Sequence, residues 1–183
     1  MNRQEADDFL KQHLDNINLL KHSYAVEVVM RKLANHFDEN EDDWGIAGLL
    51  HDIDYEQTKN DPEKHSLVGG EMLKEKGISQ AIVDSVITHN ESHNIPRESM
   101  MAKSLYCVDP LTGLIVATAL VLPEKNMKSV TVENVLNRFK EKSFAKGATR
   151  ETILKCKEIN LSLEEFVSLG VEAMKTISNK LGL

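Results

Sequence analysis

Six histidine and aspartate side chains could carry metal chemistry in this sequence of 183 residues. The centre of the set is the dipeptide His51-Asp52, which directly follows the apolar segment 44–50. An imidazole beside a carboxylate suits a hard or borderline divalent cation. The dipeptide alone is a weak signal, and its weight comes from the other members of the set, which are His22, His65, His89 and Asp109.

Each of these residues is predicted to lie on an apolar stripe of a helix. His22, for example, has Ala25, Val26 and Val29 at offsets of three, four and seven, which is one helix face. Apolar stripes face the core, and ionisable groups are rarely buried without partners. Any one histidine fits an ordinary core or half-exposed position, but the whole set is better explained by shared metal ions. His13 and His36 lie in polar surroundings and are expected at the surface.

The order His, His-Asp, His, His, Asp resembles the HD-domain superfamily of metal-dependent phosphohydrolases, over about residues 18–122. Its minimal signature corresponds here to His22, His51-Asp52 and Asp109. The segments 65–70 and 87–90 resemble the dinuclear bacterial members that cleave diadenosine tetraphosphate. The branch that cleaves cyclic dinucleotides shares a similar ligand order, but its GYP element is missing, which disfavours that branch.

The resemblance implies a role for each residue of the set. Asp52 would be the catalytic carboxylate that bridges two metal ions, with His22, His51 and Asp109 completing one site. The second ion would be held by His65 and His89. Two such ions would generate a hydroxide near neutral pH and hold the phosphoryl oxygens for in-line attack. Iron or manganese is the expected metal, while the ligand types also admit zinc, cobalt, nickel or magnesium.

A phosphate substrate also needs cationic or polar contacts. The residues expected to supply them are His93, Arg97, Arg138, Lys142 and Lys146. The alternative for the basic stretch 138–147 is a solvated helix face, and for His93 a position without contact to metal or substrate. Asp54 and Glu56, which follow the HD pair, are expected to be solvated loop carboxylates, and the alternative is that either one accepts a proton or orients a water.

Composition limits the class of protein. The length predicts a single domain over 1–183, with a catalytic core at about 18–122 and a C-terminal helical extension at about 131–183. The net charge of -7 argues against binding to a nucleic acid polymer. The longest apolar run, residues 114–122, is far short of the about 20 residues that span a bilayer. With no recognisable signal peptide, the sequence predicts a cytoplasmic protein that does not enter a membrane.

Hydrophobic periodicity and capping signals predict an all-α fold, an HD-type helical bundle with additional C-terminal helices. Asp109-Pro110 predicts a break or a kink between two helical segments, because proline disrupts the preceding turn. The predicted helices begin near Asn2 and then cover about 18–37, 42–50, 65–76, 80–89, 98–108, 111–122, 132–142, 150–160 and 163 onward.

The last helix carries an apolar stripe that includes Phe166, Leu169 and Ala173. Packing against the core is its expected use, and a homodimer interface is the alternative.

We therefore expect a metal-dependent phosphohydrolase that acts on a small phosphorylated substrate, a nucleotide or a dinucleoside polyphosphate. A mononuclear nucleoside monophosphate phosphatase of the same superfamily is the alternative enzyme. A non-catalytic nucleotide-binding sensor and a protein with purely structural metals are the alternatives of other classes. Structural sites are usually closed by four ligands, whereas six candidates are present here.

Overall fold

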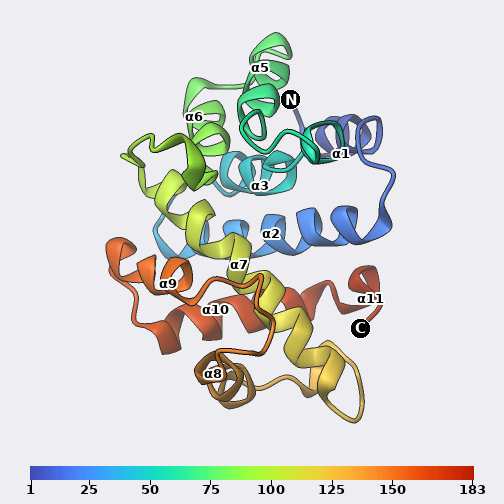
Figure 1. The fold of residues 1–183 in the computed structure, drawn as a ribbon, viewed down its shortest axis with the longest axis vertical. Coiled ribbons are helices and arrows are strands. Elements are labelled where there is room, and N and C mark those ends of the chain that lie inside the picture. The colour runs from blue at the N-terminus through green and yellow to red at the C-terminus, as the bar shows by residue number, and fades with distance from the viewer.

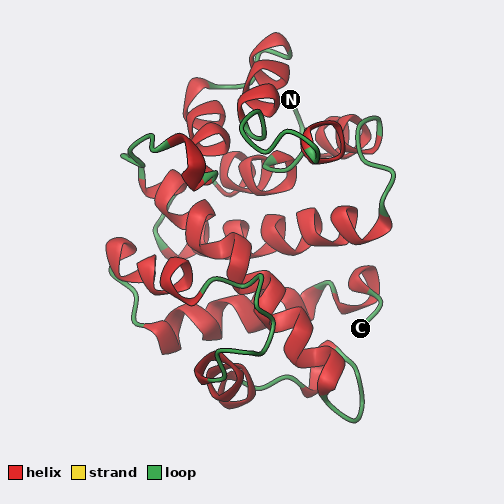
Figure 2. Ribbon diagram, viewed as in Figure 1, coloured by secondary structure: helices red, strands yellow, loops and turns green.

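The computed structural model describes residues 1–183 and consists of helices and connecting loops, with no strand (Figure 2). This confirms the predicted all-α fold class. The α-helices are α1 (Arg3–Lys11), α2 (Ile17–His36), α3 (Glu41–Leu50), α4 (Tyr55–Thr58), α5 (Leu67–Glu75), α6 (Gln80–His89), α7 (Met100–Val121), α8 (Val132–Lys140), α9 (Arg150–Ile153), α10 (Leu163–Thr176) and α11 (Ser178–Leu181). Three short 3₁₀ helices are η1 (Glu91–His93), η2 (Met127–Ser129) and η3 (Leu154–Ile159).

Helix α2 runs through the middle of the molecule, with α3 along one side and α10 along the other (Figure 1). Its predicted stripe is buried, since Val26, Val29 and Leu33 have no exposed surface. Helix α7 crosses α2 steeply and also contacts α6, α8 and α10. The buried apolar side chains of all these helices belong to one continuous cluster of 43 residues.

The predicted break at Asp109-Pro110 is wrong, because α7 continues through Pro110 as one helix. Proline has no N–H, so the bond to the carbonyl of Tyr106 is missing within the helix. Burial outweighs this loss, since Leu105, Val108 and Leu111 around the proline have no exposed surface. The interruption in backbone pairing therefore falls one residue after a predicted metal ligand.

The predicted helix over 150–160 is also only partly correct. After α9 the chain tightens into η3, which ends at Asn160 in the left-handed conformation. In a 3₁₀ helix residues three apart lie above one another. Ile153, Cys156 and Ile159 have that spacing and no exposed surface, so the tighter helix turns all three toward the core.

The stripe on α10 packs inside the molecule, as expected. Phe166 is fully buried, and Gly170 lies so close to α7 that an added Cβ would be 3.0 Å from Leu111 and Ile115. The start of α10 is a capping box formed by Ser162 and Glu165, as its sequence predicts. The same motif, from Asn2 and Glu5, begins α1.

Helix α7 is long and apolar enough to cross a membrane by length and composition. In this structure 61% of the apolar window is buried inside the protein, and the core helix of a soluble protein satisfies the same criterion.

Candidate metal centre

The six predicted ligands come from five separate segments that meet where α2, α3, α6 and α7 converge (Figure 1). His22 lies on α2, His89 is the last residue of α6, and Asp109 lies in the middle of α7. His51 caps the C-terminus of α3 and Asp52 follows it. The prediction that a helix carries His65 is wrong, since this residue lies in the turn that precedes α5.

The Asp52 carboxylate lies at the centre of the group. Its Oδ2 is 3.4 Å from Nε2 of His51 and 3.7 Å from Nε2 of His22. Its Oδ1 is 3.2 Å from Nε2 of His65 and 3.4 Å from Nε2 of His89. Asp109 joins the first half, with Oδ1 3.1 Å from Nε2 of His22. The two carboxylate oxygens of Asp52 thus face two different pairs of imidazoles.

The opposite ring nitrogen, Nδ1, is already engaged in each of these histidines. Nδ1 of His51 donates to the carbonyl of Gly48 at 2.8 Å, and that of His89 to the carbonyl of Val86 at 2.6 Å. Nδ1 of His22 lies 3.3 Å from the hydroxyl of Thr112. With the proton held on Nδ1, Nε2 carries the lone pair that a metal requires.

Asp54 holds the fourth histidine. The expectation that Asp54 is a solvated loop carboxylate is wrong, because the residue has no exposed surface. Its Oδ1 accepts from Nδ1 of His65 at 3.0 Å, and its Oδ2 accepts from the backbone N–H groups of Ser66 and Gly69. A carboxylate that orients a ligand histidine in this way is typical of metal sites. Glu56 instead accepts from the backbone of Asp15 and Asn16, before α2.

One atom of the centre has no partner within the chain. Nε2 of the fully buried His51 makes no hydrogen bond and points at the group. A buried polar atom without a partner is costly, and a metal ion would supply the missing interaction. Two sets of ligand atoms lie within 4.8 Å of one another, those of His22, His51 and Asp109, and those of His51, Asp52 and His89. The residues present therefore fit a divalent cation.

The electrostatics of the centre are strongly coupled. Burial by itself would raise the pKa of Asp52, but the charge of His51 and the imidazoles of His51, His65 and His89 that face the carboxylate hold that pKa well below its usual range. Burial by itself would lower the pKa of both His51 and His65. The Asp52 carboxylate more than compensates, raising the pKa of His51 to about 9 and, together with Asp54, that of His65 to about 10.

The model of the HD domain matches residues 19–119 of this chain. The chain belongs to the HD-domain family. All six predicted ligands lie within the matched span, and the HD domain is that of metal-dependent phosphohydrolases. The family match supports the predicted class, a metal-dependent phosphohydrolase.

Curated relatives share this HD domain within much longer chains. They include the proteins named Ribonuclease Y from Oleidesulfovibrio alaskensis, 26% identical over 81% of this chain and 31% of the relative, and from Lawsonia intracellularis, 28% identical over 87% and 34%. That of Fusobacterium nucleatum is 26% identical over 88% and 32%. The chain thus spans about a third of the length of these relatives. No solved structure matches it.

Two of the predicted substrate contacts are engaged elsewhere. Nε2 of His93 lies 2.7 Å from the carbonyl oxygen of His65, so this side chain braces the turn that carries His65. The guanidinium of Arg97 lies over the ring of Tyr106, 3.4 Å from its centroid. Tyr106 in turn lines a pocket of about 230 Å³ beside His65, on the second half of the centre.

The basic stretch divides into two parts. Arg138 pairs with Glu141 at 2.8 Å and lies over Phe144, away from the centre. Lys146 lines a pocket of about 320 Å³ together with His22 and Asp109, on the first half of the centre. A groove of about 460 Å³ continues from Lys146 past Lys142 and ends near Lys140, which the sequence prediction missed.

Asp54 and Thr112 are the other residues that sequence reasoning missed. Asp54 carried a signal, since it lies two residues after Asp52 in a segment already identified as functional. Thr112 carried none, because its contact with His22 joins residues 90 positions apart.

Proposed function

We propose that this enzyme hydrolyses a small phosphorylated substrate, a nucleotide or a dinucleoside polyphosphate, with two divalent metal ions held on either side of Asp52. The observation that carries the proposal is the division of the centre around this one carboxylate. Oδ2 faces His22 and His51, while Oδ1 faces His65 and His89. A carboxylate with both oxygens facing separate ligand pairs suits two ions rather than one.

Each residue then has a defined task. His22, His51 and Asp109 would hold one ion and His65 and His89 would hold the other, with Asp52 between the two sets. Paired divalent ions supply a lowered pKa for a coordinated water and a clamp for the phosphoryl oxygens. The chain supplies fixed geometry, since Gly48, Val86 and Asp54 lock the Nδ1 atoms of three histidines. Iron or manganese suits these mixed nitrogen and oxygen ligands.

The lysines on the 141–149 segment suit the charge of the substrate. Lys146 borders the pocket that contains His22 and Asp109, and neither it nor Lys142 makes an ion pair within the chain. An ammonium group without a carboxylate partner is available to a phosphate oxygen. We assign Lys146 to the phosphate chain at the centre and Lys142 to a more distant phosphate. The predicted cytoplasmic location agrees with a nucleotide substrate.

Metal content per chain, combined with turnover, tests the proposal. Protein purified without chelator should contain close to two transition-metal ions and should cleave diadenosine tetraphosphate or a nucleotide from a phosphate-ester panel. Asp52→Ala should lose both ions and at least a thousandfold in kcat, because it removes the only group that faces both ligand sets.

Asp8→Ala is the matched control, since Asp8 is an exposed carboxylate on α1 that contacts only Gln4. The control should keep the metal and the activity. Full activity in Asp52→Ala would contradict the mechanism. One ion per chain in the parent would favour the mononuclear nucleoside monophosphate phosphatase. Two ions with no turnover of any phosphate ester would favour the nucleotide-binding sensor.

A second candidate substrate is RNA. The curated relatives are named ribonucleases, and the groove from Lys146 to Lys140 is basic in an otherwise acidic protein. A single-stranded end could place its terminal phosphate at the centre and its backbone along these lysines. A short oligoribonucleotide in the same panel separates the two, because preference for it over diadenosine tetraphosphate would replace the small-molecule proposal.

A further inference from the structure

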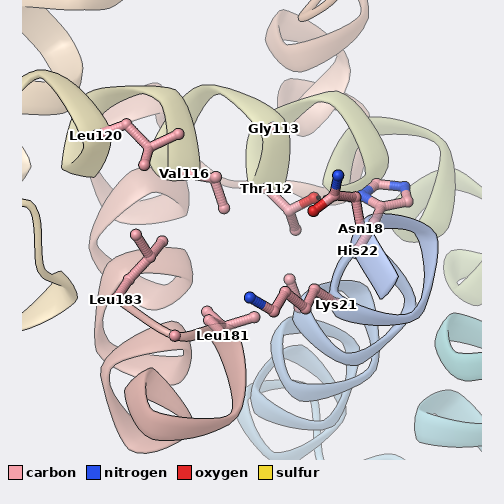
Figure 3. A pocket seen from close by; sticks show the side chains of 11 residues that line it. Asn18, Lys21, His22, Thr112, Gly113, Val116, Leu120, Leu181 and Leu183 are labelled. Carbon is pink, nitrogen blue, oxygen red and sulfur yellow. Dashed lines mark hydrogen bonds between the residues drawn. The ribbon is translucent and has the colours of Figure 1, made fainter. Parts of the chain in front are cut away.

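A pocket of about 470 Å³ lies between α2, α7 and the segment 181–183, and we call it the α2–α7 pocket (Figure 3). Its volume is in the range of pockets that bind small organic ligands. Most of its wall is aliphatic, contributed by Ala25, Val116, Leu120, Leu181 and Leu183. No side chain of the protein fills the pocket, and Leu120 on its rim is 49% exposed.

The pocket adjoins the metal centre. His22 lines it and also lines the smaller pocket that contains Asp109 and Lys146. Thr112, whose hydroxyl lies 3.3 Å from Nδ1 of His22, forms part of the same wall. Gly113 also lines both cavities, so the α2–α7 pocket lies directly beside the space next to Asp109.

The polar groups of the pocket indicate what kind of ligand fits. Asn18 lies at the His22 end, and the Lys21 ammonium extends toward the middle of the cavity (Figure 3). An aliphatic chain would leave this amide and ammonium without partners, which opposes binding. A nucleobase matches both features, since its two faces are apolar while its edge and ribose carry donors and acceptors.

We propose that the α2–α7 pocket binds the nucleoside of the substrate while the attached phosphate lies at the metal centre. The inference rests on the proposed function, because it places the phosphate beside Asp52 and Asp109. The inference narrows the substrate class to nucleoside 5′-phosphates, whose phosphate can lie at the metal centre while the base lies in this pocket. For a dinucleoside polyphosphate, it places one nucleoside here and directs the other toward the lysine groove.

Calorimetry of the manganese-loaded protein with three probes tests the assignment. The probes are inorganic thiophosphate, adenosine 5′-thiomonophosphate and n-hexyl thiophosphate, chosen because thiophosphate esters resist hydrolysis. The parent should bind the nucleoside probe about tenfold or more tightly than thiophosphate, as expected from burial of one base. The increase in affinity over thiophosphate should be smaller for the hexyl probe than for the nucleoside probe.

Leu120→Trp fills the pocket from its exposed rim and should remove the gain for the nucleoside probe while leaving thiophosphate binding unchanged. Val121→Trp is the matched control, since Val121 is the neighbouring residue on α7, is 50% exposed and does not line the pocket. Asn18→Ala is a second variant on an exposed side chain and should weaken only the nucleoside probe.

Each outcome has one meaning. The inference would be overturned if the parent bound the nucleoside probe and thiophosphate equally tightly. It would also be overturned if the tighter binding of the nucleoside probe persisted in both Leu120→Trp and Asn18→Ala. Tighter binding of the hexyl probe would overturn it in favour of an aliphatic ligand. Loss of the gain in both variants supports it. If the parent binds the nucleoside probe in this way but hydrolyses no nucleotide, the proposed function fails while the pocket assignment stands.

Discussion

Asp54 shows how one residue outside the ligand set can decide its geometry. The side chain is buried, and it is stabilised by one imidazole N–H and two backbone N–H groups. Because both its oxygens are used, the carboxylate fixes the turn 65–69 as well as the tautomer of His65. A charged group in this position also makes His65 a stronger ligand.

Asp54→Asn tests this role. An amide has one acceptor oxygen in place of two, so His65 or the backbone of the turn loses its partner. We expect the affinity of the second metal ion to fall by about 10- to 100-fold, with the first ion retained. Metal titration followed by elemental analysis would show about one ion per chain at a metal concentration that saturates the parent. Asp61→Asn, at an exposed carboxylate paired with Lys64, should keep the parent value.

At the scale of elements, α3 must approach α2 closely for His51 and Asp52, at its C-terminal end, to lie beside His22. Gly48 allows this close packing, since an added Cβ at this position would lie 3.0 Å from backbone atoms of Val26 and Glu27. The same residue provides the carbonyl that receives the Nδ1 proton of His51. Helix packing and ligand orientation therefore depend on one small residue.

Gly48→Ala should push α3 away from α2, because the contacts are with backbone that cannot rotate aside. We expect a loss of about 1–3 kcal/mol in the free energy of unfolding, as for overpacked cores, together with weaker metal binding. Urea denaturation and metal titration measure the two effects. Gly113→Ala is the control, since an added Cβ there meets nothing within 4 Å, and it should leave stability equal or higher. An unchanged Gly48→Ala protein would contradict this account of the packing.

Pro110 also affects the site through its helix, since it interrupts the backbone hydrogen bonding of α7 next to Asp109. Pro110→Ala restores an N–H that can bond to the carbonyl of Tyr106. The free energy of unfolding should rise by about 1–3 kcal/mol, because proline in a helix interior costs about 3 kcal/mol. Metal affinity should fall if the altered pairing shifts Asp109. A urea midpoint below that of the parent would show that the helix is already adapted to the proline.

At the scale of the whole molecule, a chain of net charge -7 gathers four histidines around two carboxylates. Without metal, these imidazoles compensate the carboxylates by taking up protons, which is why the pKa values of His51 and His65 are raised. Metal binding must displace these protons. Metal affinity should therefore increase with pH, and binding should release protons into an unbuffered solution.

The same linkage predicts how stability depends on pH. A pKa raised from 6.5 to about 9 for His51 and about 10 for His65 means that the folded state binds protons more tightly than the unfolded state. That stabilisation is complete below pH 6.5 and is lost as the pH rises through 9 to 10. The Tm of chelator-treated protein should fall over this range, whereas manganese-loaded protein should change less. Parallel Tm curves for the two preparations would contradict the prediction.

Residue types and their spacing were enough to predict the helical fold and the six-residue set. Helical periodicity and capping boxes are local, so α1, α2 and α10 begin close to the predicted positions, and α2 also ends close to its predicted end. His22, His51 and Asp109 were identified because their residue types and order are visible without coordinates.

The groups that support these residues can be recognised only in the folded molecule. The burial of Asp54, the continuity of α7 through Pro110 and the contact of Thr112 with His22 depend on packing between distant segments. The same is true of the two faces of Asp52 and of the α2–α7 pocket, which is enclosed by residues from both ends of the chain. Local pattern encodes which face of a helix is buried, but the identity of the facing side chain is set by long-range contacts.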